Sequence, residues 1–419
     1  MYISDINIKH YGAIKNAQIK AKFYDNGNPK PLIITGQNGS GKTLLLTNLV
    51  DSMIAIQQAE GRGKEKEDIN EIYKLENKKY IHTGANESMV KIRFKEKDQY
   101  ADYINVVSKN VHQSMMQEDI QALNVKQQFL ETGCYKNIIK THTNLKKQVL
   151  AYFPTDRYYN PAWFEKKEGG RLLYKKTSKN KTNEASKIIK GNLLEEVEEW
   201  ILDVLLDKYL YEQLTELKEY YIKMPTGDYI PAQVNQVCGY KGKNTMILTM
   251  INNLLSVIYT CKYNNIQYAR IGVSNKKTRA ISIFIKKHNE PEIEMASDFS
   301  FLSSGEIMVL SLFVSIIKEY DFLNTGKEFK FDEVEGIVII DEIDQNLHMR
   351  FVKEILPILI KTFPRIQFVL TTHSPFFLMG MKEYLGKDFS YISMPGGEEK
   401  DELEGYATIK ACYEVVCGY

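Results

Sequence analysis

The sequence predicts an α/β fold with a mixed sheet, an N-terminal antiparallel β-subdomain and an inserted helical lid. Three observations support this prediction. A short apolar run at residues 32–35 leads into a glycine-rich turn and a helix. A second apolar run at 337–340 ends in two carboxylates. Residues 2–24 alternate between apolar and polar side chains, which is typical of antiparallel strands.

The elements are expected in the following order. Alternation predicts strands at 2–9 and 17–24, and the apolar run predicts a strand before a helix at 44–53. A strand at 88–95 precedes the polar region 98–147, for which we expect helices. Further expected elements are a strand at 148–157, helices at 192–222 and 245–262, and strands at 269–274, 280–287, 337–340 and within 366–375.

The glycine-rich turn carries the pattern G-x-x-x-x-G-K-[ST] of a phosphate-binding P-loop. Its glycines allow successive backbone N–H groups to turn around a phosphate, and Lys42 can reach the β- and γ-phosphates of ATP. The Thr43 hydroxyl can ligate Mg²⁺. The predicted nucleotide-binding residues here are Gly36, Gln37, Asn38, Gly39, Ser40, Gly41, Lys42, Thr43 and Leu44.

The acidic pair Asp341-Glu342 follows a buried-strand pattern, at the edge where parallel α/β sheets place their ligands. Beside a P-loop this pair predicts a Walker B site. Asp341 would lie in the coordination sphere of Mg²⁺, and Glu342 would polarise the attacking water. His373 ends another apolar strand pattern, so we expect it at the same edge, near the γ-phosphate.

The stretch Leu302-Ser303-Ser304-Gly305-Glu306 opens an apolar helix. A helix cap alone would explain Ser303, but the N–H groups of a helix N-terminus also bind anions. Its place before the Walker B strand resembles the signature of the ABC-type ATPases, which begins Leu-Ser-Gly-Gly. The resemblance implies a P-loop NTPase of the ABC-ATPase head type. It also implies that Ser303, Ser304, Gly305 and Glu306 contact ATP held by a second subunit.

Further motifs resemble the compact RecF/OLD-like ATPases, also labelled AAA-21 or AAA-15. The resemblance covers Ile6 to Lys15, "AYFPTDR" at 151–157, "IIDEIDQNLH" and "TTHSP". It makes Arg157 a candidate nucleotide contact, more convincing than Gln148. Ser304 and His348 depart from the transporter pattern, which has Gly and Asp there.

OLD-type proteins carry a Toprim nuclease domain after the His motif, and residues 376–419 are too few for one. The resemblance therefore points to the ATPases of two-component antiphage systems such as Septu and PARIS, which hold and release a separate nuclease or toxin.

Composition limits the other function classes. The 419 residues are 43% hydrophobic and 26% charged with a net charge of +2, so overall charge does not indicate nucleic-acid binding. Five cysteines without a C-x-x-C pair suggest reduced cytoplasmic thiols. We expect neither a signal peptide nor a membrane span.

We expect an ATPase core interrupted by insertions. The predicted parts are an N-terminal ATPase lobe at 1–97, a helical insertion at 98–147, a return strand at 148–159, a helical lid at 160–268 and a C-terminal lobe at 269–419.

Two features of the lid bear on partners. Leu193, Val197, Trp200 and Val204 lie at helical spacing and predict a core or partner-binding face. Residues 165–190 hold nine Lys or Arg against three Glu, which indicates either a solvated loop or a contact with nucleic acid or an acidic partner. Three hypotheses stay open: an ATP-switched scaffold for an effector, a RecF/SMC-like DNA-repair ATPase and a non-hydrolysing structural protein.

Overall fold

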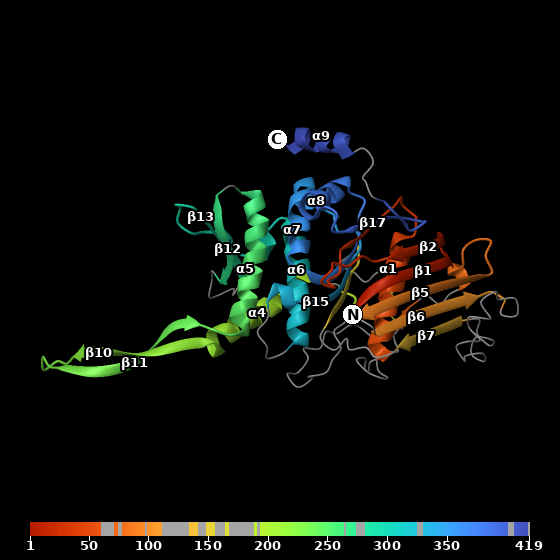
Figure 1. Ribbon diagram of the computed structural model, residues 1–419. Helices are drawn as coiled ribbons and strands as arrows, with labels where there is room; N and C mark the ends of the chain where they lie inside the picture. Colours follow the sequence, from red (N-terminus) through yellow and green to blue (C-terminus); the bar gives the residue numbers. More distant parts are fainter. Residues whose placement is uncertain are drawn as a thin grey trace. The chain divides into compact units, whose positions relative to one another are not determined.

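The computed structural model divides the chain into two compact units (Figure 1). The first unit contains Met1–Leu193 and Val334–Tyr419, and the second contains Leu194–Glu333. The second unit is therefore inserted into the first. The residues that the structure describes are 1–59, 71–73, 78–96, 99–110, 134–140, 148–155, 164–166, 188–190, 193–263, 265–273, 281–324, 330–400 and 406–417.

A largely parallel six-stranded sheet forms the centre of the first unit, in the order β18-β17-β3-β16-β15-β8. Its strands are β3 (Leu32–Thr35), β8 (Val149–Phe153), β15 (Glu335–Ile340), β16 (Arg365–Thr371), β17 (Ser390–Ser393) and β18 (Glu398–Glu399). Ile340 lies opposite both Leu370 and Phe153, and Thr371 lies opposite Ile34. The carboxyl ends of β3, β8, β15 and β16 therefore meet at one edge of the sheet.

Apolar side chains explain why these strands are central. Ile337 to Ile340 are fully buried, as are Phe368, Val369 and Leu370 of β16. Continuous apolar runs of this kind are typical of parallel strands covered on both faces. The helices of this unit are α1 (Lys42–Ala59), α7 (Leu356–Lys361), α8 (Pro375–Leu385) and α9 (Tyr406–Cys417), with short helices η2 (Lys78–Tyr80) and η6 (Phe351–Ile355).

A five-stranded antiparallel sheet forms the second layer of this unit, in the order β2-β1-β5-β6-β7. Its strands are β1 (Tyr2–Tyr11), β2 (Ile14–Lys20), β5 (Glu87–Glu96), β6 (Gln99–Ser108) and β7 (Cys134–Lys140). The apolar faces of β1 and β5 share one core with Leu45, Leu49 and Val50 of α1. The predicted N-terminal β-subdomain is thus confirmed.

The helical insertion expected at 98–147 is wrong for its described residues, because β6 and β7 extend this sheet. Five of the ten residues of β6 are β-branched or aromatic, and eight of the ten are buried, which overrides the weak helical pattern. A separate pair joins β4 (Glu71–Tyr73) to β9 (Phe164–Lys166).

The second unit mixes helices with two small sheets. It contains α4 (Leu193–Tyr211), β10 (Gln213–Lys223), β11 (Tyr229–Tyr240), α5 (Lys243–Lys262), β12 (Ile266–Val273), β13 (Ile281–Lys287), β14 (Ile293–Ala296), η4 (Phe299–Phe301), α6 (Ser304–Leu323) and η5 (Phe331–Glu333). The predicted helix at 192–222 ends at Tyr211, and 213–223 pairs with 229–240 as an antiparallel hairpin. The lid is therefore not purely helical.

The boundary expected at residue 269 also differs from the structure. Strands β12 to β14 and helix α6 belong with α5 in the second unit, and the first unit resumes only at Val334.

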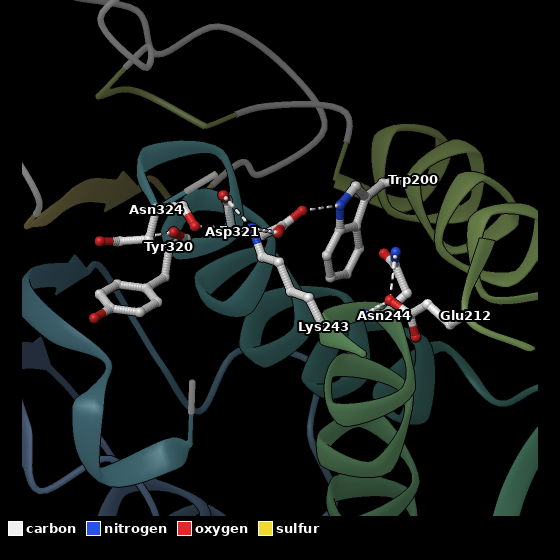
Figure 2. A network of polar contacts seen from close by, with 7 residues as sticks. All are labelled: Trp200, Glu212, Lys243, Asn244, Tyr320, Asp321 and Asn324. Carbon is white, nitrogen blue, oxygen red and sulfur yellow. Dashed lines mark hydrogen bonds and ion pairs between the residues drawn. The ribbon is translucent and has the colours of Figure 1, made fainter. Parts of the chain in front are cut away.

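Within the second unit, Lys243 forms an ion pair with Asp321 at 2.5 Å, and Trp200 donates to the same carboxylate (Figure 2). These contacts join α4, α5 and α6. No helix in the described ranges has the length and apolarity needed to cross a bilayer.

Candidate functional site

The phosphate loop lies between β3 and α1, at the carboxyl edge of the parallel sheet. Gly39 and Gly41 have φ angles of 78° and 92°, which side chains rarely tolerate. A Cβ atom on Gly41 would lie 2.8 Å from Ile14 Cγ1. Glycine is therefore required both by the backbone conformation and by the close approach of β2.

Lys42 is the first residue of α1 and is almost fully buried. Its Nζ donates to the carbonyls of Gly36 at 3.0 Å and Gln37 at 3.2 Å, which folds the side chain back over the loop. Burial lowers the pKa of Lys42, and the carboxylates of Asp341 and Glu342 act against this shift. The loop thus holds a buried cation against its own carbonyl groups.

Ser40 supplies an independent indication of an anion. Its Oγ atom is buried without a hydrogen-bond partner in the described part of the chain. A buried hydroxyl without a partner costs free energy, so such atoms typically have a ligand or water. A phosphate oxygen in the loop would satisfy it.

Asp341 follows β15 and is held by two threonines. Its Oδ2 accepts a hydrogen bond from Thr43 Oγ1 at 3.0 Å, and its Oδ1 accepts from Thr371 Oγ1. The carboxylate is buried, and its backbone N–H donates to Phe153 O. One side chain therefore connects the phosphate loop, β15 and β16.

Glu342 is partly exposed and adopts a positive φ of 47°. Its backbone N–H donates to Thr371 Oγ1 at 2.7 Å, which holds the residue in this uncommon conformation. Thr371 thus touches both acidic residues, a role that the sequence analysis missed. The repeated threonine of "TTHSP" was its only signal.

His373 lies exposed just beyond β16, so it shares the sheet edge with the phosphate loop and the acidic pair. Leu44 is half-buried, and a Cβ atom on Gly12 would collide with its side chain. Gln37 and Asn38 are exposed on the loop.

Arg157 and most of the basic stretch 165–190 lie outside the described residues. Gln148 is buried at the amino end of β8, away from the phosphate loop.

The signature residues begin α6 in the second unit. Ser303 is the N-cap: its Oγ accepts from Glu306 N, and the Glu306 carboxylate accepts from Ser303 N at 2.9 Å. Glu306 is buried and forms an ion pair with Lys262 of α5 at 2.8 Å. Burial would raise the pKa of Glu306, but hydrogen bonds from Lys262 and Ser303 lower it. Ser303 and Ser304 stay exposed, whereas Glu306, predicted as a nucleotide contact, supports the cap.

The first-unit residues fit a magnesium nucleotide. The Ser40 hydroxyl lacks a partner in the described part of the chain, Gly36 and Gly41 leave no room for a Cβ atom, and the Lys42 ammonium lies against the loop. Mg²⁺ prefers a few protein oxygens together with phosphate oxygens. Thr43 and Asp341 offer such oxygens, and the described residues contain no cluster of three acidic, His or Cys ligands that would bind a metal alone.

Comparison with known families agrees with this geometry. Residues 256–379 match the family model AAA_21, described as "AAA domain, putative AbiEii toxin, Type IV TA system". The matched range includes the signature, the Walker B residues and His373.

Curated relatives match shorter segments. The chain is 46% identical over 74 residues to the Retron Ec83 probable ATPase of Escherichia coli, a segment covering 18% of this chain and 14% of that protein. It is 53% identical over 80 residues to the Septu protein PtuA of Bacillus mycoides, covering 19% of this chain and 11% of the relative. The chain thus spans only a small part of the relatives it matches.

Solved structures with similar chains include SMC head domains. The SMC head bound to the C-winged helix domain of ScpA has a TM-score of 0.42 and 12% identity, and the alignment covers 96% of this chain and 97% of that one. The SMC head domain from Thermotoga maritima has a TM-score of 0.40, with 12% identity and coverage of 95% and 97%.

Proposed function

We propose that this protein binds and hydrolyses ATP, dimerises around the nucleotide and acts as a scaffold that controls a separate effector in antiphage defence. One observation carries the ATPase assignment. Thr43 of the phosphate loop is hydrogen-bonded to Asp341, and Glu342 follows at the same edge of the sheet. This is the arrangement that phosphoryl transfer requires, because catalysis there depends on positioning and charge.

Each residue has a distinct role in the proposed reaction. The loop N–H groups and Lys42 hold the phosphates, and Thr43 with Asp341 would hold Mg²⁺. Bound Mg²⁺ would neutralise charge that develops on the phosphate oxygens. Glu342, which is partly exposed, orients and deprotonates a water molecule. His373 stands beyond β16, where it can donate to the terminal phosphate.

The proposed dimer rests on the signature. Ser303 and Ser304 are exposed at the start of α6, whose N–H groups and helix dipole attract anions. The family resemblance implies that these groups complete the site of a second subunit. The defence role rests on the segments shared with the retron ATPases and the Septu protein PtuA.

Two variants separate binding from hydrolysis. Lys42→Ala should lose ATP binding, because the buried cation of the loop is gone. Glu342→Gln should retain ATP while its hydrolysis falls by about 100-fold or more, because only the base is removed. Glu398→Gln, a change in an exposed carboxylate of the same unit, serves as the control. Filter binding and phosphate release measure both quantities, and wild-type turnover by Glu342→Gln would contradict the assignment of the base.

The alternative is a RecF/SMC-like DNA-repair ATPase. It rests on the basic stretch 165–190. Nucleic-acid binding that falls with added salt, and that is lost when Lys175, Lys176, Lys179 and Lys181 are changed to Glu, would favour this alternative.

A further inference from the structure

The β10–β11 hairpin, here called the arm (residues 213–240), is a long two-stranded ribbon (Figure 1). Nearly all of its strand residues are exposed, including large apolar ones. An isolated two-stranded hairpin is only marginally stable in water, and further strands or other cover are needed to stabilise it. The large exposed apolar residues of the arm are Leu214, Leu217, Tyr220, Tyr221, Ile222, Met224, Tyr229, Ile230, Val234 and Val237.

The root of the arm is firmly held within the second unit. Glu212 precedes β10, and its carboxylate accepts a hydrogen bond from the backbone N–H of Asn244 at 2.6 Å (Figure 2). It also accepts one from the backbone N–H of Thr245 at 2.7 Å. Lys241 N donates to Glu212 O at 2.9 Å, and the ring of Tyr240 packs against that of Tyr209. The arm is therefore anchored to the second unit at its root.

The charges of the arm favour a protein as its occupant. The arm contains Glu216, Lys218, Glu219, Lys223 and Asp228, which are few and of both signs. Binding to nucleic acid or an anionic membrane depends on clustered positive charge, which this pattern does not provide. Aromatic and aliphatic side chains with little charge are typical of the core of protein interfaces.

The two edges of the arm differ. Pro231 has no N–H and lies opposite Tyr221, so it removes a donor from the outer edge of β11. Met224 N donates to Asp228 O at 2.8 Å, which fixes the alternation of hydrogen-bonded pairs along the ladder. Leu217 and the other odd-numbered residues of β10 consequently direct their backbone groups outward. No other strand pairs with this edge among the described residues.

Charge complementarity selects one way for two such edges to pair. In an antiparallel pair centred on Leu217, each Leu217 faces its copy and Glu216 faces Lys218 on both sides. These unlike charges fall in non-hydrogen-bonded pairs, where opposing side chains are closest. A pair centred on Lys218 or Glu219 would place identical charges opposite each other. A pair centred on Tyr221 would oppose Glu219 to Lys223, but in hydrogen-bonded pairs, where opposing side chains lie farther apart.

We propose that the arm pairs with the arm of a second copy of this chain, β10 to β10, about a two-fold axis at Leu217. The result is an antiparallel sheet of four strands, which covers the open edge of both arms. This interface lies outside the nucleotide site and requires no ATP. The tests are therefore done without nucleotide in a Lys42→Ala background, so failure of the arm interface and failure of the proposed ATPase function are distinguishable.

Complementary charge reversals test the register. Glu216→Lys alone and Lys218→Glu alone each place like charges opposite one another twice, so each should weaken dimerisation by about 10- to 100-fold. An equimolar mixture of the two variants restores unlike pairs across the interface, although the exposed Glu216–Lys218 contact within each strand stays broken. Sedimentation velocity should show monomers for each variant and dimers for the mixture. A monomeric wild-type chain, or a mixture no more dimeric than its components, would overturn the proposal.

Cysteine cross-linking tests the axis itself. In a Cys238→Ser background, Leu217→Cys places two thiols across the axis at a Cα separation of about 5.5 Å, within disulfide range. The control is Asn235→Cys, which pairs with Leu217 on the same face of the arm. In the four-stranded sheet its thiols would be about 14 Å apart, beyond that range. Rapid cross-linking of Leu217→Cys alone is expected, and equal cross-linking of both variants, or of neither, would contradict the axis.

Discussion

At the scale of single residues, Thr371 contacts both acidic residues of the proposed site, Asp341 and Glu342. It donates to Asp341 Oδ1 and accepts from Glu342 N, and it is completely buried. A single hydroxyl therefore orients the proposed Mg²⁺ ligand and maintains the positive φ of the proposed base. Groups that hold a ligand in place affect activity nearly as much as the ligands do.

Replacing this hydroxyl should separate positioning from packing. Thr371→Val keeps the shape of the side chain but leaves Asp341 Oδ1 and Glu342 N without this partner. We expect ATP hydrolysis to fall about 10- to 100-fold, and the free energy of unfolding to fall by about 1–3 kcal/mol. Thr371→Ser should recover most of both. Wild-type hydrolysis by Thr371→Val, measured by phosphate release, would show that the hydroxyl does not position the site.

The residues of the site differ in how far sequence could predict them. Gly36 to Thr43 and the pair Asp341-Glu342 are local patterns, and the structure brings them together. Thr371 depends on the parallel register of β15 with β16, which no local pattern encodes. Glu306 matches a signature position, but its ion pair with Lys262 joins residues distant in sequence.

At the scale of elements, the arm shows why helical spacing can mislead. Leu193, Val197, Trp200 and Val204 lie at helical spacing, and the helix expected from them extends through residue 222. The backbone instead pairs with 229–240 across a turn that contains Pro225 and Gly227. Tyr and Ile residues on both sides of that turn favour strands. Pairing of β10 with β11 therefore outweighed the helical spacing of the apolar residues.

Glu212 stabilises the start of α5. The N-cap, Gly242, has no side chain, and the Glu212 carboxylate takes its place with four hydrogen bonds from Asn244 and Thr245. Burial would raise the pKa of Glu212, but these hydrogen bonds outweigh it and lower the pKa. The charged form is therefore favoured in the folded state, and its contribution to stability is lost as pH falls through the lowered pKa.

A comparison with Glu212→Gln across pH should reveal this contribution. At pH 7 the variant should be less stable by about 1 kcal/mol. The difference should shrink below about pH 4, as the wild-type carboxylate becomes protonated. Chemical unfolding followed by Trp200 fluorescence in a Trp163→Phe background would report on the second unit, because the chain has two tryptophans. A difference that stays constant from pH 7 to pH 3 would contradict the charged cap.

At the scale of the whole molecule, the proposed nucleotide dimer needs two units from different subunits. The phosphate loop belongs to the first unit and the signature to the second. A subunit with a defective phosphate loop should therefore complement a subunit with a defective signature. Lys42→Ala removes a phosphate loop, whereas Ser303→Arg blocks a signature and leaves its own loop intact.

Mixing these two variants tests whether sites are shared. Half of the dimers in an equimolar mixture are heterodimers, and each retains one intact composite site. About a quarter of wild-type hydrolysis should therefore return if subunits exchange freely. Fluorescence energy transfer between labelled subunits provides the exchange control. Complete exchange without recovered hydrolysis would indicate sites contained within single subunits.

Helix α5 is braced against α6 at both of its ends. Lys243, its first residue, bonds Asp321 and the Asn324 carbonyl at the end of α6, whereas Lys262, its last, bonds Glu306 at the start of α6. A helix of 20 residues is about 30 Å long. Helix α5 is therefore fixed to α6 at both ends, so the two helices cannot slide past each other without breaking an ion pair. The root of the arm and the cap at Ser303 thus lie at opposite ends of one pair of helices joined by ion pairs.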